Sequence, residues 1–259
     1  MWHFSTSFEP YSQNALDTHL SALKKRESLL DFDTLGRTLA YCPFTSRVSL
    51  EDFIRRDSSA NRACELPSNE LYAFIQGAQE VEKEIEKELK TQGHKNAFFC
   101  IDTLRIALFL EQGMSQKQTK AQAKHTRNLT FEHLEFLSHL RRYTSLPIIH
   151  KSAFVSEYEI LESALYGADC VLLESSLLSA KELKNLILFA SRLMLTPICS
   201  VHNSTEVKKA IFAGAQALYL PSKSYDSLLS LLPQSCVISS HLAPKTRGLD
   251  VSFGVLRKD

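Results

Sequence analysis

The chain has 259 residues, with 30 Lys and Arg against 29 Asp and Glu, so its net charge is +1. Hydrophobic residues make up 44% of it and charged residues 23%, as in an ordinary globular protein that buries a sizeable core. This balance excludes binding to nucleic acid or an anionic membrane through overall charge. No apolar run approaches the roughly 18 residues that a membrane-spanning helix needs.

The six cysteines indicate a reducing compartment. None belongs to a C-x-x-C pair, and most lie in or beside short apolar runs, so buried free thiols explain them better than disulfides or zinc. The first residues, MWHFSTSFEPYSQN, lack the basic-then-apolar order of a signal peptide. We therefore predict a cytoplasmic protein without a metal site.

The first predicted elements are helices. Within residues 13–56, Leu16, Leu20 and Leu23 recur at helical spacing. This stretch precedes a different, repeating pattern. We interpret it as an N-terminal helical extension that is able to cover one end of the domain that follows.

From about residue 60, short apolar runs alternate with amphipathic stretches, which is typical of successive βα units and a parallel sheet. The predicted strands are 62–66, 97–102, 147–151, 169–174, 197–202, 216–220, 235–239 and 250–254, and the predicted helices between them are 69–90, 131–143, 179–193 and 204–213. Eight strands close a (β/α)8 barrel. The predicted fold is thus an α/β TIM barrel over residues 60–259, in one domain with the extension.

Two places disturb this pattern. Residues 113–129 form a basic insertion with Lys117, Lys120, Lys124 and Arg127 and no acid between 115 and 128, and it is either a flexible insertion or a binding tail for an anionic partner. Only ten residues separate the last two strands, whereas a parallel crossover usually needs about a dozen or more. The barrel is therefore expected to be irregular or incomplete at its C-terminal end.

One lysine is placed like a site residue. Lys151 ends a predicted strand in LPIIHKSAFVSEYEILESALYGADCVLLE, residues 146–174. Ligands of parallel α/β proteins bind at the carboxyl ends of the strands. The alternative is an ordinary solvated lysine.

The segment LPIIHKSAFVSEYEI followed by ALYGADCVLL resembles the indole-3-glycerol phosphate synthases, whose hallmark is P-x-x-R-K-D-F before a Tyr-containing helix. LGRTLAYCPF, residues 35–44, and SVHNSTEVKKAIFAGAQALYL, residues 200–220, resemble further elements of the family. The resemblance implies a (β/α)8 barrel with an extra N-terminal helix. It also implies a phosphorylated small-molecule substrate, whose indole ring is closed with release of carbon dioxide and water, and no metal or organic cofactor.

The resemblance also implies roles for four residues. Lys151 matches the family's general acid, and Glu65 matches a glutamate of the first strand. Phe154 matches a phenylalanine of the substrate site, and Gly254 matches a glycine that approaches the phosphate. These are the predicted catalytic residues (Lys151, Glu65) and binding residues (Phe154, Gly254).

Other family positions carry different chemistry here. Ser200 stands where the family has a catalytic glutamate, Pro221 replaces a substrate-contacting asparagine, and His241 replaces a phosphate-binding glycine. Nearer the lysine, His150 and Ser152 replace an arginine and an aspartate, and Pro67 falls on a family lysine. A hydroxyl cannot replace a carboxylate as a proton acceptor near neutral pH. Losing a base typically costs about 10²–10⁴ in rate.

Three hypotheses follow. The chain is an active or weakly active synthase, or a catalytically inactive paralogue that binds another enzyme of the pathway as a scaffold, or a different phosphosugar enzyme on the same barrel. The histidines at strand ends, His150 and His202, fit no metal-ligand spacing and are interpreted as structural. A new polar site of His241 with Ser239 and Ser240 is a further alternative.

Overall fold

The computed structural model describes residues 2–3, 8–55, 59–66, 83, 97–108 and 129–256. Eight parallel strands follow one another around a closed barrel, because the last strand pairs with the first. They are β2 (Asn61–Glu65), β3 (Ala97–Asp102), β4 (Ile148–Lys151), β5 (Cys170–Glu174), β6 (Thr196–Ser200), β7 (Ala217–Tyr219), β8 (Val237–Ser240) and β9 (Val251–Leu256). The predicted TIM barrel is confirmed.

Side chains alternate between the interior of the barrel and the layer under the helices, as the two-residue period of a strand requires. The interior cluster includes Ile149, Leu172 and Ile198. Their neighbours along the chain, such as Val171 and Cys199, pack in the outer cluster instead. Four of the six cysteines are buried and all six are free thiols, as predicted.

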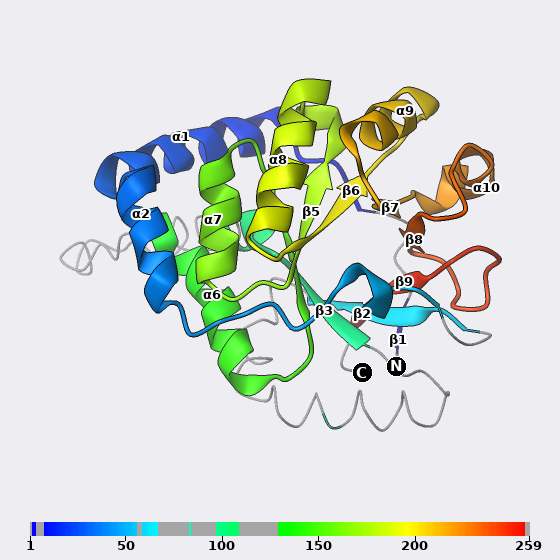
Figure 1. Cartoon of the computed structure of the whole chain (residues 1–259), viewed down its shortest axis with the longest axis horizontal. Helices are drawn as coiled ribbons and strands as arrows, with labels where there is room; N and C mark the ends of the chain where they lie inside the picture. Colours follow the sequence, from blue (N-terminus) through cyan, green and yellow to red (C-terminus); the bar gives the residue numbers. More distant parts are fainter. Residues whose placement is uncertain are drawn as a thin grey trace, which may run out of the picture.

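Helices cover the outside of the strands (Figure 1). They are α6 (Leu129–Tyr143), α7 (Glu157–Leu165), α8 (Ala180–Arg192), α9 (Ser204–Ala213) and the short α10 (Tyr225–Leu229). The side chain of Ser179 caps α8, with Glu182 completing the predicted capping box. Gly214 ends α9 with a φ of 93°, a conformation that glycine adopts without a steric penalty.

The N-terminal extension is partly helical. It contains α1 (Gln13–Leu29), α2 (Phe32–Thr38) and the 3-10 turns η1 (Leu39–Tyr41) and η2 (Leu50–Asp52), while residues 42–49 are not helical. Pro43 lacks a backbone N–H, and the backbone N–H of Arg47 donates to Asp169 on the barrel instead of to a helical carbonyl. In Figure 1, α1 and α2 lie beside α6 and α7.

Buried ion pairs fix α1 to α7. Arg26 donates to both carboxylate oxygens of Glu162 at 2.8 and 3.2 Å. Nε2 of His19 lies 2.6 Å from Oε1 of Glu159, which lies three residues before Glu162 on α7. Burial raises the pKa of Glu162 to about 7, although Arg26 opposes the shift. The chain segment that leads into α1 is therefore held next to the carboxyl ends of the strands.

The end of the chain is irregular, as expected, yet the barrel closes. No helix lies in the ten-residue connection from β8 to β9, which is built from turns with Gly248 at a φ of 74°. Asp250 fixes it by accepting from the backbone N–H groups of Ile238 and Arg55. The short β8 pairs with β7 on one side and, on the other side, with the start of β9 alone. The strand β1 (Trp2–His3) pairs antiparallel with the end of β9.

The other predicted elements divide into two groups. All eight predicted strands are confirmed within two residues at each end, as are the helices at 131–143, 179–193 and 204–213. The predicted helix 69–90, apart from residue 83, and the basic insertion 113–129, apart from residue 129, lie outside the described residues. Within the part of the chain that the structure describes, no helix is long and apolar enough to cross a membrane.

Candidate functional site

Lys151 ends β4 and faces the mouth of the barrel, the end where the strands reach their carboxyl termini. Its ammonium Nζ lies 3.0 Å from Oδ2 of Asp102 at the end of β3, and each side chain is only 4% exposed. The same oxygen accepts from the hydroxyl of Tyr11 at 3.0 Å, and Nε of Arg105 lies 3.3 Å away. A buried cation therefore sits in a paired, hydrogen-bonded environment at the predicted place.

The segment before α1 closes over this lysine. The Phe8 ring centroid lies 3.9 Å from the ammonium of Lys151, within the range of a cation–π interaction. The Phe8 backbone N–H donates to the hydroxyl of Tyr219 on β7 at 3.2 Å. Arg105 holds the following residues by donating to the carbonyl of Glu9. Burial, followed by the charge of Asp102, raises the pKa of Tyr11 well above its usual value.

Glu65, the predicted carboxylate, ends β2 and lies in the same mouth. His241, just after β8, bridges two strands: its Nδ1 lies 2.7 Å from the hydroxyl of Tyr219 and its Nε2 lies 3.3 Å from Glu65. Burial opposes ionisation of Glu65, but the hydrogen bond with His241 and the charge of Lys151 outweigh it and lower the pKa of Glu65. His241 thus joins a polar site through Glu65, while Ser239 donates to the backbone carbonyl of Leu218.

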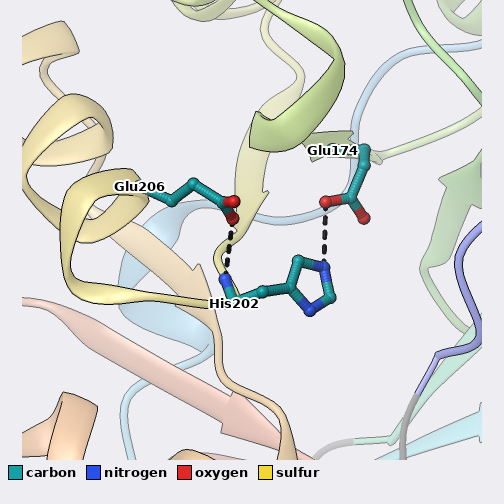
Figure 2. Close-up of side chains that lie close together, drawn as sticks. All are labelled: Glu174, His202 and Glu206. Atoms are coloured by element: carbon teal, nitrogen blue, oxygen red, sulfur yellow. Dashed lines mark hydrogen bonds and ion pairs between the residues drawn. The ribbon is translucent and has the colours of Figure 1, made fainter.

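A second cluster of ionisable side chains lies at the ends of β5 and β6. Oε1 of Glu174 lies 2.9 Å from Nε2 of His202, and the same nitrogen lies 3.2 Å from the hydroxyl of Ser200. Glu206, in the first turn of α9, completes a set of three side chains whose ligand atoms lie within 4.8 Å of one another (Figure 2). Such a set of oxygen and imidazole donors is compatible in composition with a divalent cation.

Three residues that the sequence drew attention to face away from the mouth. His150 is buried between Thr103 and Ser163, each 2.8 Å from one ring nitrogen, which supports its interpretation as structural. Phe154 has no exposed surface and packs edge-on against His150. Gly254 pairs with Cys64 in the sheet. The binding roles of Phe154 and Gly254 stay predictions.

The sequence reasoning did not single out Asp102, Glu174, Phe8 or Tyr11. Asp102 and Glu174 are the last residues of two predicted strands, the same position that drew attention to Lys151. An inspection of every polar residue at a predicted strand end finds both. No comparable signal marks Phe8, because its partners lie more than 140 residues away in the sequence.

A parallel (β/α)8 barrel whose mouth holds a buried lysine among carboxylates is a TIM barrel with a charged site at the carboxyl ends of its strands. The family model for indole-3-glycerol phosphate synthase matches residues 126–225. The synthase of Campylobacter jejuni (strain 81-176) is 35% identical over 198 residues, covering 76% of this chain and 67% of that protein. That of Campylobacter curvus is 33% identical over 231 residues, covering 83% and 78%. The chain belongs to the indole-3-glycerol phosphate synthase family.

Solved structures give a weaker match. A mutant tryptophan synthase alpha-subunit from Pyrococcus furiosus is 12% identical, with a TM-score of 0.49 and coverage of 78% of this chain and 88% of that one. The family assignment rests on the sequence relatives and not on this likeness.

Proposed function

We propose that the protein is a cytoplasmic carbon–carbon carboxy-lyase of tryptophan biosynthesis, which converts 1-(2-carboxyphenylamino)-1-deoxyribulose 5-phosphate to indole-3-glycerol phosphate. The observation that carries the proposal is Lys151, a buried ammonium at a strand end with Asp102 as its partner. The synthase relatives support the same reaction class.

The reaction needs an acid where the ketone is attacked. The ring carbon that bears the carboxyl group forms a bond to the ketone carbon, and Lys151 protonates the ketone oxygen as it becomes a hydroxyl. Carbon dioxide then leaves, and its bonding electrons restore the aromatic ring. Loss of the hydroxyl as water, together with one carbon-bound proton, forms the double bond of the indole.

Asp102 pairs with Lys151 directly, and Glu65 is the second carboxylate of the mouth in our proposal. The charge of Lys151 lowers the pKa of Glu65, so the two groups interact electrostatically across the mouth. His241 holds the carboxylate of Glu65 in place, with its Nε2 3.3 Å from Oε2 of Glu65.

The proposed turnover is slow compared with that of a synthase that keeps the whole family set. Ser200 and Pro221 supply neither the carboxylate nor the amide of the family positions. Each lost base or electrostatic group costs about 10²–10⁴ in rate, and such losses do not simply multiply. Phe8 must also leave Lys151 before a substrate can reach it, since Lys151 is 3% exposed.

The second candidate function is that of an inactive paralogue that binds another enzyme of the pathway. The burial of Lys151 under Phe8 favours this candidate, because a lysine that stays covered cannot contact a substrate. The two candidates differ in one measurable quantity, the formation of indole-glycerol phosphate.

The test is turnover of the carboxylated substrate, followed by the fluorescence of the indole product. We expect the wild-type chain to exceed Lys151→Ala by at least about 10². Lys181→Ala, which removes an exposed lysine of α8, is the matched control and should keep wild-type turnover. Equal rates for the wild type and Lys151→Ala would reject the synthase and favour the inactive paralogue.

A further inference from the structure

Glu174 and Ser200 end two neighbouring strands at the same height. They are register partners in the pairing of β5 with β6. Leu172 and Ile198, two residues earlier on each strand, pack inside the barrel. The two-residue period therefore directs Glu174 and Ser200 to the inner side as well, at the mouth.

His202 fixes the carboxylate of Glu174 beside the hydroxyl of Ser200. One nitrogen, Nε2, lies 2.9 Å from Glu174 and 3.2 Å from Ser200. The Glu174 side chain is 13% exposed and the imidazole is 31% exposed, so the pair is anchored on one side and open on the other. The end of β6, where Ser200 has no carboxylate, therefore lies beside the carboxylate of Glu174 from β5.

The third member of the cluster, Glu206, has a different task. Its Oε2 accepts from the backbone N–H of His202 at 2.8 Å, and its Oε1 accepts from the side-chain amide of Asn203 at 2.7 Å. Figure 2 shows this carboxylate on the backbone of His202 and away from its ring. Both oxygens hold the start of α9, so the cluster is better described as a carboxylate–imidazole pair than as a metal site.

The other ring nitrogen of His202 is free to act. Nδ1 points away from Glu174 in Figure 2 and forms no hydrogen bond with any residue that the structure describes. When Nε2–H donates to Glu174, Nδ1 carries the lone pair that accepts a proton. A carboxylate that orients an imidazole in this way stabilises the imidazolium that forms.

We propose that His202 is a catalytic base of the barrel mouth and that Glu174 is its positioning residue. This inference rests on the proposed synthase reaction and concerns its last step. Nδ1 takes the proton from the carbon bonded to the amine nitrogen, and the C–H electrons form the carbon–carbon double bond. Lys151, which has regained from solvent the proton that it gave to the ketone oxygen, protonates the hydroxyl, and the hydroxyl leaves as water.

The charges around His202 set the pH at which it acts. Among the residues that the structure describes, Glu174 of β5 and Glu206 of α9 are the ionisable groups whose charges act on His202 from the elements packed against it. The hydrogen bond with Glu174 raises the pKa of His202 above its usual value, and partial burial opposes the shift. Turnover should therefore rise with pH as His202 loses its proton.

The kinetic test compares three variants of the full chain. His202→Asn should lose about 10²–10⁴ in turnover. Glu174→Gln should lose less and should move the acidic limb of the pH–rate profile to lower pH, an effect that a purely structural residue would not have. Glu182→Gln makes the same change in the exposed capping box of α8, where glutamine still caps, and should leave both rate and profile unchanged. Wild-type rates and profiles in both mouth variants would overturn the inference.

A second readout does not depend on turnover. The ¹⁵N resonances of His202, assigned by their absence in His202→Asn, are titrated with pH with and without the borohydride-reduced substrate. We expect a lower pKa in Glu174→Gln and a shift of Nδ1 when the reduced substrate is added. A shifted resonance without wild-type turnover would reject the synthase but keep the pair, whereas no shift would reject the pair whatever the turnover.

Discussion

The barrel mouth has a covered half and an open half, and the ionisable side chains are buried in the first and partly exposed in the second. In the covered half, at the ends of β3 and β4, the ammonium of Lys151 and the carboxylate of Asp102 are each 4% exposed beneath Phe8. In the open half, at the ends of β5 and β6, the imidazole of His202 keeps 31% of its surface exposed beside Glu174. Solvent screens the second pair but not the first.

This difference separates two requirements of a catalytic site. A cation kept ready as an acid benefits from burial with a fixed partner, whereas a group that exchanges protons with a ligand needs an open side. A barrel can meet both needs at one end, because each strand contributes its last residues independently. Substitutions in and around each half should therefore have effects that follow the burial of the groups they remove.

The largest effect is expected from breaking the buried pair. Asp102→Ala leaves the ammonium of Lys151 buried without its partner, which typically costs about 3–5 kcal/mol of unfolding free energy. Glu9→Ala removes another acid that contacts Arg105, but its side chain is 80% exposed and its loss should cost less than about 1 kcal/mol. Urea unfolding at pH 7 measures both, and equal losses would show that Lys151 is not buried in solution.

His150, next to Lys151 in the chain but on the other side of the strand, should cause a loss of stability in acid. Burial lowers its pKa to about 3, from 6.5 in an unfolded chain. Below pH 6.5 His150 binds a proton in the unfolded chain but not in the folded chain. Its contribution to the free energy of unfolding therefore falls between pH 6.5 and about pH 3, and it is constant above pH 6.5. Between pH 6.5 and 4 the loss is about 3 kcal/mol at roughly 1.4 kcal/mol per pKa unit.

The measurement for His150 is urea unfolding from pH 7 to pH 4 in the wild type and His150→Gln. Carboxylates such as Glu65 contribute to acid unfolding in both proteins, so only the difference between the two curves reports on His150. The variant should show the shallower fall. Parallel curves would mean that His150 reaches solvent in the folded chain.

A smaller effect should follow from uncovering the lysine. Phe8→Ala removes the ring above Lys151 at 3.9 Å, and a desolvated cation–π contact is worth about 2 kcal/mol. Reductive methylation of Lys151, followed by mass spectrometry, should then be about 10–30-fold faster. Phe32→Ala changes a phenylalanine of α2 that is already 39% exposed and should leave the rate unchanged. Equal rates in all three proteins would mean that Phe8 does not control access.

The fold was predictable because its signals are local. The strand Ala97–Asp102 is a run of five apolar residues that ends in an aspartate, and all six residues are buried. The capping box of Ser179 and Glu182 lies within four residues. The closure of the barrel was harder to predict, because β8 and β9 are joined without a helix. The turn that joins them depends on Asp250, whose partners lie 12 and 195 residues away.

The site was predictable only at strand ends. Lys151 was singled out because a strand end at the carboxyl edge points to a ligand, whereas Glu65 was singled out by its match to the family. The strand-end rule also leads to Asp102 and Glu174. The cover by Phe8 was not, since an isolated phenylalanine in a segment without periodicity gives no information about its partners. Local patterns specify which residues reach the mouth, whereas long-range packing decides which of them are covered.

The smallest effect is expected from removing metal ions, and it tests the open half directly. Glu174, His202 and Glu206 would form a cation site if all three carboxylate and imidazole groups were available. Both oxygens of Glu206 instead accept hydrogen bonds from His202 N–H and Asn203, and a metal would have to break them. Prolonged treatment with a chelator should therefore leave turnover and the His202 resonances unchanged. If the chelator abolished turnover and one equivalent of Zn²⁺ restored it, Glu206 would be a metal ligand, and the open half would not be a carboxylate–imidazole pair that only transfers protons.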